Sequence, residues 1–227
     1  MGVPNLPEEY DQLDQWKTLM FLYNAALQEV QTRINVLSDE FHHINHYNPI
    51  EHVKARIKAP ESIVKKLKRL GFEATIDNMY RELHDIAGIR IICSFTSDIY
   101  YLADAISRQD DVKVEMVKDY IANPKPNGYR SYHMVVVVPI YLSSGLVQMR
   151  VEIQIRTIAM DFWASLEHKI HYKFEGAAPE HMRENLKECA DMAAVLDERM
   201  LALNESLQKA GEKKGFGNRS SKSTRMA

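Results

Sequence analysis

Residues 147–155 read VQMRVEIQI, in which an apolar and a polar residue alternate at every step. Because successive side chains of a strand point to opposite faces, this stretch predicts a strand with one apolar and one polar face. The apolar face carries Val147, Met149, Val151, Ile153 and Ile155, and the polar face carries Gln148, Arg150, Glu152, Gln154 and Arg156. A core is therefore expected on one side of the strand, with charged and amide groups on the other.

The neighbouring segments extend this strand into a sheet flanked by helices. Residues 86–95 (IAGIRIICSF) and 132–140 are dense in β-branched residues, which favours central strands. Residues 112–120 alternate as a further strand, and residues 51–58 are expected to be extended. The segments predicted to be helical are residues 60–70, 99–108 and 158–174. Strands with helices before, between and after them are typical of an α/β or α+β fold with a mixed sheet.

A long helix is predicted at each end of this core. Apolar residues recur at steps of three and four from Leu13 to Phe41, Pro7 suits the first turn, and Asn48-Pro49 ends the helix. A second helix begins at Pro179, and its apolar residues form a heptad seam. The seam consists of Met182, Leu186, Cys189, Ala193, Leu196, Met200, Leu203 and Leu207. It is expected either to pack on the first helix of the same chain or to form a contact between subunits.

These patterns divide the chain into four parts. Residues 1–48 contain the N-terminal helix, residues 49–176 the sheet core, and residues 177–210 the C-terminal helix. Residues 211–227 are rich in Gly, Ser and Lys and contain few apolar side chains, which predicts a disordered basic tail.

The composition is that of an ordinary globular protein, with 45% hydrophobic and 26% charged residues among 227. A formal net charge of −2 argues against a dedicated nucleic-acid binder. No apolar run approaches the roughly 20 residues that span a bilayer, and the polar N-terminus lacks the features of a signal peptide. Cys93 and Cys189 lie among apolar residues and are expected to be reduced core thiols. We therefore expect a cytoplasmic protein without a membrane partner.

Two acidic residues are candidate ligands for a metal ion. Glu152 shares the polar face of its strand with Arg150 and Gln154; such a face often only meets water, but a carboxylate held among cations and amides also suits metal-assisted phosphoryl transfer. Asp85 precedes the strand that contains Arg90. These two residues could form a structural ion pair. Alternatively, Asp85 binds Mg²⁺ and the Arg90 guanidinium stacks on a purine base.

A basic segment surrounds the predicted start of the helix at Pro60. Its cations and hydroxyl belong to Arg56, Lys58, Ser62, Lys65 and Lys66. Backbone amides and the helix dipole favour phosphate at such a position, although a solvated basic face gives the same pattern.

Residues 118–133 (KDYIANPKPNGYRSYH) form the most irregular stretch of the core. Prolines and a glycine dictate a turn, and rings alternate with cations and donors. The residues concerned are Lys125, Tyr129, Arg130, Tyr132 and His133. A loop of this kind beside a central strand indicates a nucleotide site, because functional residues favour loops on rigid scaffolds.

Two metal-binding patterns carry little weight. His42 and His46 lie one helical turn apart, beside His43, but neither an acid nor a third ligand accompanies them. The dipeptide His84-Asp85 is typical of metal-dependent phosphohydrolases that are all-helical, whereas here it leads into a strand, so we reject that assignment. The phosphate-binding patterns GxxxxGK[ST] and GxGxxG are not found.

Five segments in this order resemble the synthetase domain of the RelA/SpoT family, and in particular its small stand-alone RelQ/RelP-type members. They are residues 56–62, 84–95 (HDIAGIRIICSF), 123–133 (NPKPNGYRSYH), 151–157 (VEIQIRT) and 161–173 (DFWASLEHKIHYK). The resemblance covers residues 51–174. It implies a nucleotidyltransferase-like mixed sheet, and transfer of the β,γ-diphosphate of ATP to the 3′-hydroxyl of GTP or GDP. The products would be AMP and (p)ppGpp, the alarmone of the stringent response, and the resemblance also implies a homotetramer.

The same resemblance, carried over position by position, implies a role for each site residue. Asp85 and Glu152 would hold Mg²⁺, and Glu152 would help to deprotonate the attacking hydroxyl. The implied ATP-binding residues are Arg56 and Arg90, on either side of the adenine, and Lys58, Ser62 and Lys66, on the phosphates. The implied GTP-binding residues are Tyr129, stacked on guanine, Asp161, at the guanine edge, and Lys125, His133 and Gln154, near the phosphates, ribose or reacting groups.

Two other functions stay open at this point. An offshoot of the family could pyrophosphorylate another acceptor, such as an adenine nucleotide or a tRNA 3′ end, and would need a base contact other than Tyr129 with Asp161. A regulatory protein could instead bind single-stranded RNA through the segment from Lys209 to Arg225, which carries six basic residues and one acid. The alternative for that segment is a solubilising tail.

Overall fold

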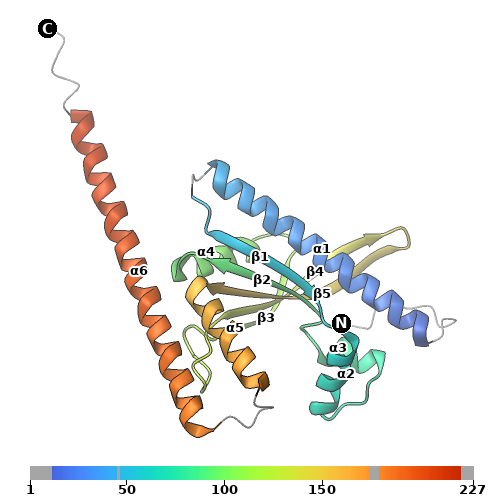
Figure 1. Ribbon diagram of the computed structural model, residues 1–227. Helices are drawn as coiled ribbons and strands as arrows, with labels where there is room; N and C mark the ends of the chain where they lie inside the picture. Colours follow the sequence, from blue (N-terminus) through green and yellow to red (C-terminus); the bar gives the residue numbers. More distant parts are fainter. Residues whose placement is uncertain (1–11, 45–46, 174–178, 221–227) are drawn as a thin grey trace.

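The computed structural model describes residues 12–44, 47–173 and 179–220 and is built on one five-stranded sheet (Figure 1). The strands are β1 (Ile50–Ile57), β2 (Ala87–Cys93), β3 (Lys113–Asp119), β4 (Tyr132–Leu142) and β5 (Gly145–Thr157). Their order across the sheet is β1-β2-β5-β4-β3. Strands β2 and β5 are parallel and the other neighbours are antiparallel, which confirms the predicted mixed sheet.

Six helices accompany the sheet in the described ranges. They are α1 (Gln12–Ile44), α2 (Pro60–Arg69), α3 (Ile76–Glu82), α4 (Thr96–Ser107), α5 (Ile158–Lys173) and α6 (Glu180–Ser220). The sequence predicted each of them except α3, which spans seven residues and is too short to show helical periodicity. Its start is marked locally, because the Thr75 hydroxyl caps the helix by accepting a hydrogen bond from the Asn78 N–H.

The core lies between the apolar face of the sheet and helices α1 and α4. Figure 1 shows α1 running across the strands, and the apolar side chains of β5 beneath it are fully buried, among them Val151 and Ile153. Helix α4 covers the same face, since the Phe41 ring of α1 lies 5.3 Å from the Tyr101 ring of α4. The alternation of residues 147–155 thus gives the predicted apolar face, and the opposite face is left for the site.

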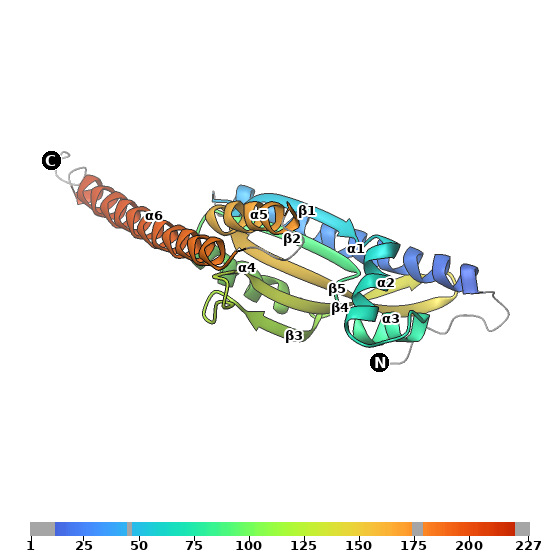
Figure 2. The same ribbon diagram turned by 60° about the horizontal axis from the view of Figure 1, so that its bottom comes forward.

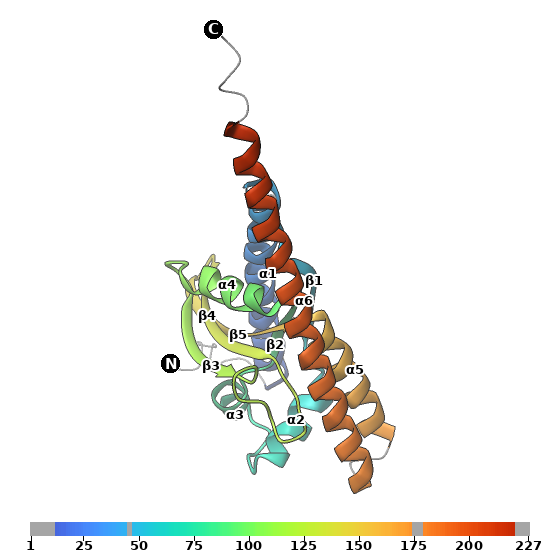
Figure 3. The same ribbon diagram turned by 90° about the vertical axis from the view of Figure 1, so that its left-hand side faces the viewer.

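Helix α6 differs most from expectation. It packs beside α5 and touches α4, so the prediction that its seam lies on the first helix of the same chain is wrong (Figure 3). Its outer part extends away from the body (Figure 2), and seam residues Leu196, Leu203 and Leu207 are exposed. The helix continues to Ser220, whereas disorder was predicted from Gly211; helix propagation adds one hydrogen bond per residue, and Glu212, Lys213 and Lys214 are good helix formers.

The two cysteines lie in different environments. Cys93 is a buried thiol, as predicted, but Cys189 is exposed on α6, so its assignment to the core is wrong. Cys189 lies on the part of α6 that packs beside α5, but it lines the groove between the two helices and so stays exposed. Pro7, His46 and residues 221–227 lie outside the described residues. Within the described ranges, no helix is both long enough and apolar enough to cross a membrane.

Candidate active site

Two adjacent hollows on the polar face of the sheet share a pair of carboxylates. The first, about 380 Å³, is lined by Lys54, Ala55, Arg56, Asp85, Gly88, Ile89, Arg90, Glu152 and Gln154. The second, about 330 Å³, is lined by Lys66, Leu70, Glu82, His84, Asp85, Met116, Lys118, His133, Val135 and Glu152. Asp85 and Glu152 belong to both linings. Each hollow has a volume typical of a site for part of a nucleotide.

The register of the strands explains why these side chains meet. Arg56 of β1 pairs with Gly88 of β2, which pairs with Glu152 of β5. The next row joins Arg90 to Gln154. Paired residues point to the same face, so both rows project into the hollows. Because Gly88 has no side chain, space is left between the side chains of Arg56 and Glu152 in this row.

Asp85 is held by two lysines and keeps one oxygen free. Its Oδ2 accepts hydrogen bonds from Lys58 Nζ and, at 2.8 Å, contacts Lys66 Nζ. Its buried Oδ1 has no hydrogen-bond partner within the described residues. Burial raises the pKa of Asp85, but the hydrogen bonds and charges of the two lysines outweigh burial, so the net pKa lies below its ordinary value. The predicted alternative of an Asp85–Arg90 ion pair is wrong, because Arg90 pairs with Asp161 instead.

Glu152 is the second ionised carboxylate. His133 Nδ1 lies 3.1 Å from its Oε1, and Gln154 Nε2 donates to its Oε2 at 2.9 Å. Burial raises the pKa of Glu152, and the contacts with His133 and Gln154 lower it further than burial raises it. Both carboxylates are therefore charged at neutral pH and available to a cation.

The donor set fits Mg²⁺ that is bound jointly with a substrate. Among the described residues, no group of three or more acidic, histidine or cysteine side chains could hold a metal ion by itself. Magnesium commonly uses one or two carboxylates together with substrate phosphates and water. The unpartnered Oδ1 of Asp85 beside ionised Glu152 meets that requirement.

A network of rings and cations borders the second hollow. The Tyr129 hydroxyl lies 2.8 Å from His133 Nε2, and Lys125 Nζ lies 4.7 Å from the centre of the Tyr129 ring and 4.6 Å from that of Tyr120. His133 continues the network to Glu152. The loop of residues 118–133 thus brings Lys125, Tyr129 and His133 together.

Arg156 connects this network to Asp161, and sequence reasoning did not single it out as a site residue. Its guanidinium is buried and donates to the Tyr129 hydroxyl at 2.6 Å and to Asp161 Oδ1 at 3.1 Å. Asp161 Oδ1 also accepts from Arg90 at 3.2 Å. The signal was present, because Arg156 shares the alternating face of Glu152 and Gln154.

Most predicted residues therefore converge, and one does not. Arg56 and Arg90 line the first hollow, Lys58 and Lys66 bind Asp85, and Gln154 lies between Glu152 and Arg156. Ser62 is exposed in the first turn of α2 and lines neither hollow. The structure adds Lys54, His84 and Lys118 to the linings.

Comparisons with known proteins identify the family of the chain. The model of the region found in RelA / SpoT proteins matches residues 55–177. GTP pyrophosphokinase YwaC of Bacillus subtilis is 45% identical over 207 residues, which cover 91% of this chain and 99% of that protein. GTP pyrophosphokinase YjbM of the same organism is 36% identical, with 86% and 92% covered.

Solved structures give the same result. The crystal structure of small alarmone synthetase 2 from Bacillus subtilis superposes with a TM-score of 0.76 at 47% identity, covering 84% of this chain and 98% of that one. Small alarmone synthetase 1 from Bacillus subtilis, bound to its product pppGpp, superposes with a TM-score of 0.80 at 35% identity, covering 86% and 99%. The sequence and fold comparisons agree, and the chain belongs to the RelA/SpoT family.

Proposed function

We propose that this chain is a GTP pyrophosphokinase, which transfers the β,γ-diphosphate of ATP to the 3′-hydroxyl of GTP or GDP and so makes (p)ppGpp and AMP. The observation that carries this proposal is the sharing of Asp85 and Glu152 by two adjacent hollows. A reaction between two nucleotides needs two sites whose reacting ends meet. The relatives named GTP pyrophosphokinase and small alarmone synthetase support the same activity.

ATP is assigned to the first hollow. The guanidinium planes of Arg56 and Arg90 suit the two faces of the adenine, a stacking role that lysine cannot fill. Lys58 and Lys66 lie at Asp85, where their charges would hold the donor phosphates. Ser62, one helical turn before Lys66, is exposed and lines neither hollow, and it would contact a phosphate only where the donor extends past the start of α2.

The acceptor is assigned to the second hollow and the adjoining loop. Tyr129 would stack on the guanine, and Asp161 would accept from the N1–H and amino groups of the base after exchanging a contact with its arginines. Lys125, His133 and Gln154 would then lie near the phosphates, the ribose or the reacting groups.

Transfer requires one bond to form and one to break. The 3′-oxygen attacks the β-phosphorus of ATP, the bond from that phosphorus to the α,β-bridging oxygen breaks, and AMP leaves. Glu152, which is ionised, would accept the proton of the 3′-hydroxyl. Lysines at Asp85 neutralise the phosphate charge and keep the donor in line, which is most of the catalysis that phosphoryl transfer demands. When bound to Asp85 and Glu152, Mg²⁺ would supply further charge neutralisation at the phosphate oxygens.

The test is a product assay with a matched variant. The purified protein is incubated with Mg²⁺, ATP and GTP or GDP, and the products are separated by anion exchange beside Glu152→Gln, which keeps the size of the side chain. AMP and a guanosine tetra- or pentaphosphate should appear together and be missing from the variant. Turnover in the variant above about a tenth of the parent rate would refute the role of Glu152. Intact ATP with no guanine product would reject the proposal, and adenine nucleotides or a tRNA would be tried next.

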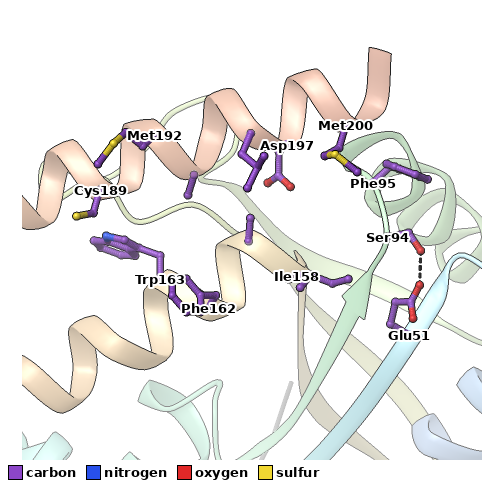
Figure 4. Close-up of a pocket in the computed structure, with 13 residues that line it drawn as sticks. Glu51, Ser94, Phe95, Ile158, Phe162, Trp163, Cys189, Met192, Asp197 and Met200 are labelled. Atoms are coloured by element: carbon purple, nitrogen blue, oxygen red, sulfur yellow. Dashed lines mark hydrogen bonds between the residues drawn. The ribbon is translucent and has the colours of Figure 1, made fainter. Parts of the chain in front are cut away.

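We also infer self-association, for which the resemblance suggests a homotetramer. An apolar groove of about 840 Å³ lies between α5 and α6, and Phe162, Met192, Leu196 and Met200 line it (Figure 4). All four side chains are exposed, and exposed apolar side chains gathered along one groove are typical of an interaction site. We also place the protein in the cytoplasm, where both nucleotide substrates are available. The RNA-binding alternative rests on the basic segment from Lys209 to Arg225. Most of its side chains lie outside the part of the chain that the structure describes.

A further inference from the structure

Helix α6 forms the outer wall of the loop that carries Tyr129. Gly128, which is buried in this loop, has a φ of +88°, and a Cβ added to it would lie 2.5 Å from the Cβ of Ala190. Two carbons do not approach that closely without a clash, so the loop backbone lies directly on the helix. The Cα of Lys187, one turn earlier on α6, would lie 3.6 Å from the same added atom.

The residues on both sides of Gly128 continue this contact. Tyr129 packs against a small apolar cluster formed by Trp163 and Ala164 of α5 and Ala190 of α6. Arg130 NH2 lies 3.5 Å from Asp191 Oδ1, on the residue that follows Ala190. Three successive loop residues therefore contact or approach the same turn of α6.

The contacting turn of α6 is itself fixed to the body. Trp163 Nε1 donates to the Leu186 carbonyl oxygen at 2.7 Å, and the Thr157 hydroxyl donates to Asp197 at 2.6 Å. These bonds lie on either side of Ala190 along the helix. Residues after 177, and with them this wall, lie beyond the segment matched by the family model.

We propose that Ala190 is a positioning residue for the acceptor nucleotide: its small side chain lets the loop settle on α6 and so sets the place of the Tyr129 ring. The inference rests on the proposed function, in which Tyr129 stacks on the acceptor base. A larger side chain at position 190 displaces the loop and Tyr129, while Arg56, Arg90, Lys58 and Lys66 on the donor side lie on other elements. The consequence is an effect on the acceptor without an equal effect on ATP.

The first test compares Ala190→Leu with Ala190→Gly and with Ala202→Leu. Ala202 is exposed on α6 and receives the same added volume away from the loop. We expect Ala190→Leu to raise the KM for GDP about tenfold and to leave the KM for ATP within about twofold, because overpacking acts only where the groups touch. Ala190→Gly weakens the helix but leaves space for the loop at Gly128, so the KM of this variant for GDP should stay close to that of the parent.

The outcomes separate positioning from simple loss of stability. A rise in the KM for GDP in Ala190→Leu alone supports the proposal. A KM for GDP in Ala190→Leu equal to that of the parent overturns it. Equal rises for GDP and ATP, or equal effects of the leucine and glycine variants, overturn it as well, because helix stability would then account for both.

A second measurement keeps the proposal testable if Ala190→Leu does not fold. Gly128→Ala adds the single Cβ that meets Ala190, and its effect on GDP binding is measured by calorimetry alone and together with Ala190→Gly. Part of the loss in Gly128→Ala comes from its positive φ, and the part due to the clash should be restored in the double variant. If the double variant binds GDP as weakly as Gly128→Ala alone, the clash with Ala190 is not the cause of the weaker binding, and the proposal is overturned.

The parent protein distinguishes this inference from the proposed function. A parent that binds no GDP and makes no guanine product rejects the proposed function itself. A parent that binds GDP and makes product, while Ala190→Leu behaves identically, rejects only the role of Ala190.

Discussion

The two faces of β5 hold their side chains by different means. On one face, Val151 and Ile153 are fully buried beneath α1 by apolar packing that has no direction. On the other, Arg150 and Arg156 are 8% and 4% exposed and are covered by side chains that hydrogen-bond to them. An apolar core tolerates side chains of altered shape at a cost in stability. A hydrogen-bonded network is directional and therefore fixes the position of each polar group. Changes on the two faces should therefore separate stability from chemistry.

The largest effect is expected on the polar side, from Asp85→Asn. The amide keeps the shape but removes the charge that faces Lys58 and Lys66 and the oxygen offered to Mg²⁺. Turnover should fall about a thousandfold, roughly 4 kcal/mol of transition-state stabilisation, as when one preorganised electrostatic group is removed. Single-turnover assays at saturating Mg²⁺ measure this. Asp104→Asn, at an exposed site on α4, is the control and should retain parent turnover.

The next effect belongs to the apolar face. Ile153→Ala should lower the free energy of unfolding by about 3 kcal/mol, because a fully buried side chain leaves a cavity beneath α1. Chemical denaturation measures the loss, and Ile158→Ala, at a position that is 56% exposed, should change it little. Turnover per folded molecule should be retained. If Ile153→Ala kept the stability of the parent but lost turnover, the apolar face would serve the chemistry and not the stability, contrary to the comparison.

The sequence predicts the sheet well because alternation is a local signal. The strand at residues 147–155 follows from alternation and that at residues 132–140 from its β-branched residues, and the structure confirms both. The position of α6 could not be predicted in the same way. A heptad seam shows that an apolar face needs a partner, but it does not identify the partner; of the two alternatives, packing on α1 is wrong, because α6 packs on α5 and α4.

In the site, too, local patterns were predictable and long-range partners were not. Asp85 and Glu152 were predicted because one precedes a strand and the other lies on the polar face of a strand, and the structure places both at the same two hollows. The partner of Arg90 was not predictable. Asp161 lies 71 residues further along the chain, and only the parallel pairing of β2 with β5 brings the two together.

A smaller effect is expected at Tyr129, at the edge of the polar network. Tyr129→Ala should weaken GDP binding by about 2 kcal/mol, the usual contribution of one aromatic ring stacked on a base. Tyr129→Phe keeps the ring and loses only the contacts with His133 and Arg156, so it should bind GDP within a few-fold of the parent. Calorimetry with GDP compares them. Equal losses in both variants would assign the role to the hydroxyl instead of the ring.

The smallest effect concerns the far end of the polar face, where Glu115 binds Arg150. Arg150 NH2 donates to Glu115 at 2.9 Å and NH1 donates to the Tyr80 carbonyl at the same distance, so the pair ties α3 to β3 and β5. Glu115→Gln should cost about 1 kcal/mol of stability, since the carboxylate is 30% exposed and water screens the pair.

This last effect should depend on pH in one direction. The hydrogen bond from Arg150 lowers the pKa of Glu115 in the folded protein. The carboxylate therefore contributes stability above the pKa of an unfolded glutamate, about 4.3, and loses that contribution as the pH falls through the lower folded value. The difference in free energy of unfolding between parent and Glu115→Gln should stay constant from about pH 6 to 8 and shrink below about pH 4.3. A difference that grows toward acid would mean that the ion pair does not stabilise the fold, and that Arg150 is held by Tyr80 alone.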